Sequence, residues 1–249
     1  GKKNAENMKG YDLGYTPVPD PEDYVHGEWF WESGFDRHPI EELEVTRDWN
    51  LVSAYSAFSA MKNYGAHAAR DPQQHANAEL SWLAYVGGTR ETKQLLGEVI
   101  LKGSDIEGKT PFDDSCVLTT WSIDLHVPEE KYVKGNPEHP FISRAIHRHA
   151  VDKRIGYPIP YRCFYSRNVP NLFMAGRNIS VDRDALGTIR VMKTIGMMGV
   201  CVGRSAALCR VHNCLPRDIY ENHLDQAKNL WRMPGKERVE SLDALKQKL

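Results

Sequence analysis

The spacing of apolar residues in the first half of the chain predicts two helices. Over residues 48–63 apolar side chains recur at helical intervals, and Asp48 is the expected N-cap. A second helix is expected from Pro72 to about Val86, because proline suits a first helical turn and Gly87-Gly88 would end it. Residues 90–101 have both helical and β character, so the sequence leaves their secondary structure open.

Strict alternation predicts one β-strand from Val117 to Val127. On a strand, side chains two positions apart share a face. Asp124 and His126 are therefore expected to point the same way.

In the second half, residues 170–176 form a short apolar run that suits a buried parallel strand. A long helix is expected from about Thr188 to Arg210, with a stripe of small residues that something should approach closely. The stripe consists of Gly196, Gly199, Gly203, Ala206 and Ala207. One further helix should begin at Pro216 and continue through Ile219, Leu224 and Leu230. Residues 236–249 resemble a short amphipathic helix.

Residues 10–40 are rich in proline, glycine and aromatic residues, which predicts an ordered loop with short strands. Within it, residues 27–34 could hold aromatic rings and carboxylates against a ligand. They could equally form a hairpin face that packs on a helix.

Composition narrows the class of protein. The 249 residues are 41% hydrophobic, and 32 basic against 33 acidic residues leave a net charge of −1. This composition is typical of a soluble α/β or α+β protein, and it argues against a nucleic-acid-binding protein, which would carry a basic excess. No apolar run approaches the ~18 residues of a membrane helix, so no membrane partner is expected.

Cysteine and histidine spacing gives no sign of a metal site. The five cysteines are an odd number without a CxxC pair, which predicts inert reduced thiols and favours the cytoplasm, with the periplasm left open. The run His147-Arg148-His149 has poor spacing for zinc ligands and is expected to be a solvated basic turn.

The segment from residue 171 to 203 carries the most specific chemistry. A predicted strand, a loop and a helix follow one another, and the helix is expected to open at Gly187-Thr188-Ile189-Arg190. A helix N-terminus offers unpaired N–H groups and partial positive charge, which suits an anion or an electron-rich ring edge. Gly187 would let the backbone approach a ligand closely.

Three motifs in this region resemble the C-terminal signature of the FAD-dependent oxidoreductase family. They are GYPIPYR at residues 156–162, NLFMAGRNIS at residues 171–180 and ALGTIRVM at residues 185–192. The family comprises bacterial flavoproteins related to the glutathione-reductase-like superfamily, some of them called xanthan lyases. Upstream, VGGTRE with LLG at residues 86–97 and IDLH at residues 123–126 also fit, so the resemblance spans residues 25–232.

The resemblance implies FAD as cofactor and assigns roles residue by residue. The turn of Gly176, Arg177 and Asn178 would lie by the ribityl and pyrophosphate groups. The helix start formed by Gly187, Thr188, Ile189 and Arg190 would face the pyrimidine end of the flavin, where Arg190 would stabilise the negative charge of the reduced ring. Both arginines could instead be ordinary surface or ion-pairing residues.

His126 is the expected proton-handling residue, with Asp124 as its orienting partner, although a strand histidine could also be purely structural. The chain departs from the family pattern at Arg183, where many relatives have histidine, and at Lys193, where proline is commoner. These two differences leave the particular reaction open.

The implied fold is α/β: the C-terminal part of a Rossmann-like FAD-binding domain plus most of an inserted α+β substrate domain. Residues 1–155 would belong to the inserted domain, residues 156–232 to the FAD-binding domain and residues 233–249 to a charged tail. The sequence contains no Gly-x-Gly-x-x-Gly turn, so an N-terminal FAD-binding half is expected as a partner in cis or in trans. A truncated product, a split subunit and a flavin-free remnant all stay open.

The expected function is hydride-type oxidation or reduction of a small organic substrate, with carbohydrate as one candidate. The alternative is a non-catalytic module of flavoprotein descent that binds a ligand or a partner.

Overall fold

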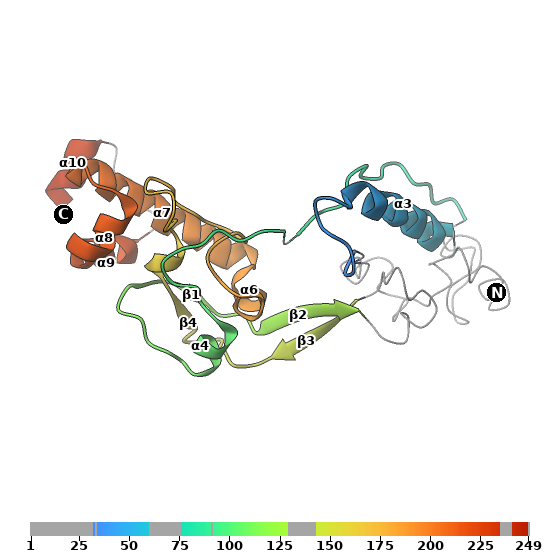
Figure 1. Cartoon of the computed structure of the whole chain (residues 1–249), viewed down its shortest axis with the longest axis horizontal. Coiled ribbons are helices and arrows are strands. Elements are labelled where there is room, and N and C mark those ends of the chain that lie inside the picture. Colours follow the sequence, from blue (N-terminus) through green and yellow to red (C-terminus); the bar gives the residue numbers. More distant parts are fainter. Residues whose placement is uncertain are drawn as a thin grey trace. The chain divides into compact units, whose positions relative to one another are not determined.

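The computed structural model describes residues 32, 34–59, 76–90, 92–128, 143–234 and 241–248. The chain forms two compact units, residues 1–92 with 126–145 and residues 93–125 with 146–249. Helices combined with small sheets fit the α/β class (Figure 1). The predicted domain boundaries, which follow a different division, stay a prediction.

In the first unit the main element is helix α3, Leu43–Ser59. The helix predicted at residues 48–63 is therefore confirmed over residues 48–59, and residues 60–63 lie outside the described residues. The helix begins five residues earlier, so Asp48 is an interior residue and the predicted N-cap is wrong. The helix predicted from Pro72 is also wrong over its described part, because residues 76–86 form turns and irregular structure. That segment is tied to α3 by Arg47, which donates to the hydroxyl of Tyr85 at 2.8 Å and lies 4.7 Å from the ring centroid.

The second unit contains the antiparallel pair of β1, Ser115–Thr119, and β4, Tyr157–Pro160. A second pair joins β2, Ile123–Pro128, to β3, Ser143–Arg148, and each of these two strands has residues in both units. The single strand predicted over residues 117–127 is thus wrong, because it is two strands in two different sheets.

Side-chain hydrogen bonds explain why the strand breaks. The Thr119 hydroxyl donates to the carbonyl of Thr188 at 2.8 Å, and the Thr188 hydroxyl donates to the carbonyl of Trp121 at 2.6 Å. These bonds satisfy backbone and side-chain groups where the strand ladder stops.

Residues 95–101 run as an extended segment rather than a helix. Leu101 forms a parallel bridge with Val181, and Leu95 donates to the carbonyl of Asn178 at 2.9 Å. On the other side, Glu98 donates to the carbonyl of Arg162 at 3.1 Å. At Gly97 a Cβ would come within 2.5 Å of that same carbonyl, so the segment needs glycine there.

The buried strand predicted at residues 170–176 does not form. Over these residues, all of them described, the β-type pairing is limited to an isolated antiparallel bridge between Tyr165 and Phe173, although Met174 itself is buried. A short apolar run cannot by itself distinguish a buried strand from a buried loop.

The rest of the second unit contains the following helices. The elements are α4, Gly103–Glu107; the 3₁₀ turn η5, Tyr161–Cys163; α6, Arg183–Ile189; α7, Met192–His212; α8, Pro216–Asn222; α9, Leu224–Arg232; and α10, Leu242–Lys248. The helix start predicted at Pro216 is confirmed, but the single helix predicted through Leu230 is wrong, because α8 ends at Asn222 and α9 begins at Leu224. The C-terminal helix is confirmed over Leu242–Lys248, and the start of its predicted range lies outside the described residues. The single helix predicted over residues 188–210 is wrong, because the extended residue Val191 separates α6 from α7.

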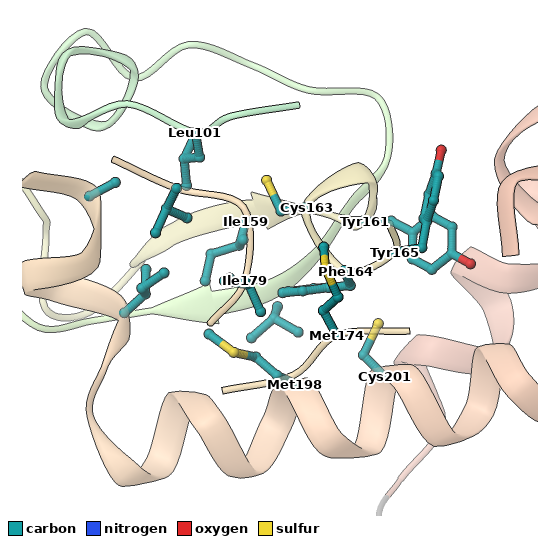
Figure 2. Packing of buried hydrophobic residues seen from close by; sticks show 14 of the residues in the cluster. Leu101, Ile159, Tyr161, Cys163, Phe164, Tyr165, Met174, Ile179, Met198 and Cys201 are labelled. Atoms are coloured by element: carbon teal, nitrogen blue, oxygen red, sulfur yellow. The ribbon is translucent and has the colours of Figure 1, made fainter. Parts of the chain in front are cut away.

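The core of this unit lies between the β1–β4 pair and one face of α7 (Figure 2). From α7, Met198 and Cys201 point toward Ile159, Phe164 and Met174. Beside them Tyr161 is fully buried, and its ring lies 5.1 Å from both Tyr165 and Trp231, between centroids. The Tyr161 hydroxyl donates to the carbonyl of Pro216 at 2.8 Å, which ties η5 to α8.

Of the described helices, α7 is the one that is long and apolar enough to cross a membrane. Length and composition alone are weak evidence, because the core helix of a soluble protein meets the same criterion. In α7, Thr194, Met198, Cys201, Ser205 and Leu208 are buried within the unit. The expectation of no membrane partner stays a prediction.

Candidate functional site

The turn formed by Gly176, Arg177 and Asn178 is open to solvent. Gly176 has φ +105°, a conformation that residues with a side chain rarely adopt. Among the described residues, a Cβ there would have only the Asn178 side-chain oxygen within 4 Å, at 3.7 Å. Arg177 and Asn178 are exposed, whereas Ile179 immediately after them is fully buried. The turn is therefore held firmly at one end and presents backbone, amide and guanidinium groups at the surface.

Gly187, Thr188 and Ile189 are instead committed to internal packing. They form the last turn of α6, and all three are buried, Thr188 and Ile189 completely. The helix begins at Arg183, where the Asp182 side chain accepts a hydrogen bond from Ala185 N–H at 2.8 Å. The prediction that a helix opens at residues 187–190 is thus wrong.

The position of Gly187 explains its residue type. A Cβ there would lie 2.8 Å from the carbonyl oxygen of Asp124 and 3.0 Å from its nitrogen, so glycine is required by the strand behind it. The burial of Thr188 and Ile189 leaves them no accessible atom for a ligand in this conformation. Direct flavin contact by these three residues stays a prediction that their environment does not support.

The helix N-terminus expected near Arg190 lies slightly downstream, at the start of α7. Val191 is the N-cap residue and makes no side-chain capping bond, and by helix geometry the first N–H groups of α7 have no partner within the helix. Met192, the first residue of α7, is 90% exposed. Arg190 directly precedes this N-terminus, so the combination of arginine and helix start that the sequence suggested is retained.

Arg190 is held by Asp124. Its Nη2 donates to the backbone carbonyl of Asp124 at 3.1 Å and lies 3.8 Å from the carboxylate Oδ2. Only 18% of the Arg190 side chain and 13% of the Asp124 side chain are exposed. Two more groups contact this carboxylate: Trp121 Nε1 donates to Oδ2 at 3.5 Å, and His147 Nδ1 lies 4.0 Å from Oδ1.

The run His147-Arg148-His149 lies on and directly after β3 rather than in a turn, so that prediction is wrong. Arg148 is paired with Asp184 and, at 3.2 Å, with Glu107; the hydrogen bond that Arg148 donates to Asp184 raises the pKa of the guanidinium. Nδ1 of His149 lies 2.9 Å from the Ser122 hydroxyl. Within the described ranges no group of three or more histidine, cysteine or acidic side chains could hold a metal ion.

In the first unit, His126 lies in a cluster with Glu32 and Arg90. Both carboxylate oxygens of Glu32 lie 2.8 Å from Nδ1 of His126. Arg90 Nη1 pairs with Oε1 of Glu32 and lies 3.1 Å from the same imidazole nitrogen. The prediction that Asp124 orients His126 is therefore wrong, because the carboxylate beside the ring belongs to Glu32.

Sequence reasoning missed this cluster for a clear reason. The three residues come from segments up to 94 positions apart, so no spacing rule connects them. Two weak signals were present: Arg90 lies in one segment that carries the family resemblance, and Glu32 lies in the aromatic block whose carboxylates could face a ligand.

All five cysteines are free thiols, as expected. Burial raises the pKa of Cys163 well above its usual value and that of Cys209 to about 12. Because only the thiolate is a strong nucleophile, these two thiols are unreactive near neutral pH.

A comparison with protein families matches residues 22–229 to the family described as FAD dependent oxidoreductase. The chain belongs to this family. The match covers nearly the same range as the motif resemblance, and membership implies FAD as the cofactor and an oxidoreductase as the enzyme class. Neither the curated proteins nor the solved structures contain a match to the chain.

Proposed function

We propose that this flavoprotein transfers hydride equivalents to or from a small organic substrate, and that the chain contributes flavin contacts and the walls of a substrate-binding domain. Family membership over residues 22–229 carries this proposal. The finer assignments, a glutathione-reductase-like Rossmann arrangement with an inserted domain, belong to the proposal. So does an N-terminal FAD-binding half, in the same polypeptide or in a partner.

The environment of each residue divides the proposed FAD contacts into two groups. Gly176, Arg177 and Asn178 suit the ribityl and pyrophosphate groups, because an open turn with a guanidinium and an amide can bind phosphate oxygens. Arg190 and the start of α7 suit the pyrimidine end. Gly187, Thr188 and Ile189 would act indirectly, by fixing the position of Arg190.

FAD supplies the hydride chemistry when bound, and the residues of this chain supply charge and a proton acceptor. Arg190 places a fixed positive charge beside a helix N-terminus, an arrangement that stabilises negative charge. Its attachment to the Asp124 backbone fixes the direction of the guanidinium. His126 would accept or return the proton that accompanies oxidation of a substrate O–H or N–H group.

The first test is the visible spectrum of the native full-length protein, purified together with any N-terminal half that accompanies it. We expect a yellow protein with bound flavin. A colourless, flavin-free protein would overturn the proposal and favour a non-catalytic binding module of flavoprotein descent.

The assignment of Arg190 needs a second measurement. We expect Arg190→Ala to weaken flavin binding and to lower the flavin reduction potential, because the reduced ring loses a stabilising positive charge. Arg190→Lys keeps the positive charge, so it should retain part of the wild-type flavin affinity and reduction potential. Arg210→Ala, at an exposed position on α7, is the matched control. Unchanged affinity and potential in Arg190→Ala would show that the assignment is wrong.

A further inference from the structure

We propose that Glu32 is a positioning residue for His126. It holds the imidazole with its proton on Nδ1, so that Nε2 is the nitrogen that exchanges a proton with the substrate. This inference rests on the proposed function, which assigns proton transfer to His126, and it adds the residue and the tautomer that make such transfer possible.

The contact with Glu32 determines the tautomer. Both carboxylate oxygens lie 2.8 Å from Nδ1, within hydrogen-bonding distance. An ionised carboxylate can only accept hydrogen bonds, and both of its oxygens lie closer to Nδ1 than the donor Nη1 of Arg90, which is 3.1 Å away, so we place the hydrogen on Nδ1. In a neutral imidazole the other nitrogen, Nε2, then has the lone pair.

Arg90 fixes the carboxylate in turn. Its Nη1 donates to Oε1 of Glu32, the same oxygen that the imidazole contacts. The nearby position of Nη1, 3.1 Å from Nδ1, follows from this convergence of two donors on one acceptor. With a guanidinium on one side and an imidazole on the other, the carboxylate has little rotational freedom.

Burial strengthens the arrangement. Only 10% of the His126 side chain and 16% of the Glu32 side chain are exposed, whereas Arg90 is 39% exposed. Charges interact more strongly where water is largely excluded. The Nδ1 side of the ring therefore faces a carboxylate that is largely shielded from water.

His126 takes up the proton of the substrate at Nε2. The Nε2 lone pair forms a bond to the proton of a substrate hydroxyl or amine, and the substrate O–H or N–H bond breaks. His126 becomes an imidazolium that keeps its Nδ1 proton, and the carboxylate of Glu32 compensates the new positive charge. The proton leaves later from Nε2, so the ring never has to turn.

The test is ¹⁵N NMR of the histidine side chains in the native full-length protein, at a pH well above the usual histidine pKa of ~6.5. The His126 signals are identified by their loss in His126→Gln. We expect a protonated Nδ1 and an unprotonated Nε2. A wild-type ring protonated on Nε2 would overturn the inference without the need for any further variant.

Two variants sharpen the result. Glu32→Ala should convert His126 to a mixture of tautomers, and Glu32→Asp, which keeps an acceptor-only carboxylate, should retain protonation on Nδ1. Ser122→Ala is the matched control, because that hydroxyl contacts Nδ1 of His149 and its loss should move only the His149 signals. A folded Glu32→Ala protein with an unchanged His126 tautomer would contradict the proposal.

The two proposals can fail separately. The ring tautomer is measured without substrate turnover, so a flavin-free protein would overturn the proposed function while the NMR result still decides the role of Glu32. A flavin-containing protein in which Nε2 of His126 is protonated would overturn the role of Glu32 and leave the proposed function standing. In the holoenzyme we expect Glu32→Ala to lower the rate of proton-coupled flavin reduction by roughly 10²-fold, the lower end of the contribution of a general base.

Discussion

Gly187 and Asp124 are in backbone contact: a Cβ atom on Gly187 would lie 2.8 Å from the Asp124 carbonyl oxygen and 3.2 Å from its carbonyl carbon. The same carbonyl oxygen of Asp124 accepts a hydrogen bond from Nη2 of Arg190 at 3.1 Å. The close approach of α6 to β2 therefore determines where the Arg190 guanidinium can lie.

Gly187→Ala should destabilise the protein. The neighbouring atoms belong to a strand backbone and cannot move aside like a flexible side chain, so overpacking of about 1–3 kcal/mol is expected. Urea unfolding measures the change. Because β2 would also be displaced from Arg190, flavin affinity should fall in the same variant.

Gly199→Ala is the matched control for this prediction. Gly199 lies on α7, and among the described residues no atom is within 4 Å of the position that a Cβ would occupy, so alanine should stabilise the helix by up to about 1 kcal/mol. Equal effects of the two substitutions would contradict the packing role of Gly187.

Asp182 is expected to matter for stability because one carboxylate serves two elements. It accepts from Ala185 N–H at 2.8 Å to cap α6 and from Gly103 N–H at 3.0 Å at the start of α4. Asp182→Ala should lower the free energy of unfolding by about 1–2 kcal/mol, and Asp182→Asn should lower it less, because asparagine is also a good N-cap. Equal losses in the two variants would mean that capping is not the cause.

The sequence predicted best where the determining interactions are local. Apolar spacing predicted the helical character of α3 and of the range covered by α8 and α9, and Pro216 predicted where α8 begins. The start of α3 and the break at His223 were missed. The interruption at Val191 and the split between β1 and β2 depend on contacts such as that of Thr119 with Thr188, 69 positions away, which no local pattern contains.

In the candidate site, too, the residues that are defined by local sequence were easier to predict than the contacts between distant segments. Gly176 and Arg190 were assigned from the order of the family motifs, and their contacts with FAD stay predictions. Gly187 was assigned to a ligand because a glycine that allows close approach looks the same in sequence whether a cofactor or a strand approaches it. The partner of His126 was missed because Asp124 is near in sequence whereas Glu32 is near only in space.

Arg204 should stabilise the packing of α9 on α7. Its Nη1 donates to the carbonyls of Leu230, Trp231 and Met233, each at 2.9 Å. Carbonyls at the end of a helix lack partners within the helix and carry partial negative charge, so a guanidinium suits them. Arg204→Met should cost about 1.5–3 kcal/mol in unfolding free energy, the usual value for hydrogen bonds to a charged group.

Two comparisons isolate the guanidinium. Arg204→Lys keeps the charge but loses the planar fork, so an intermediate loss is expected. Arg210→Met, at an exposed position on the same helix, should change stability by less than about 0.5 kcal/mol. A loss in Arg210→Met as large as that in Arg204→Met would mean that the effect belongs to helix α7 in general.

The stacked pair of His212 and His223 should make stability depend on pH. The two rings lie 3.9 Å apart between centroids, at the junction of α7 with α8 and α9. Burial, and then the charge of His212, lower the pKa of His223 below its usual value of 6.5, while Asp218 acts in the opposite direction. The imidazole of His212 also contacts Gln226 Oε1 at 2.8 Å.

The direction of the effect follows from proton binding. His223 binds a proton more weakly in the folded state than in the unfolded state, so the contribution of this residue to stability is complete above pH 6.5. It is lost as the pH falls below 6.5 and the unfolded chain becomes protonated, until the pH reaches the lowered folded-state pKa. Urea unfolding at about pH 8 and about pH 5.5 brackets the upper edge of this window, which is set by the pKa of histidine in an unfolded chain.

His223→Gln should reduce the loss of stability between these two pH values. His212→Gln should reduce it less, because it removes the repulsion between the rings but leaves His223 buried, and burial is the larger cause. If the stability of His223→Gln had the same pH dependence as that of the wild type, the stacked pair would contribute nothing to this pH dependence. Other titrating groups would then have to explain any acid sensitivity.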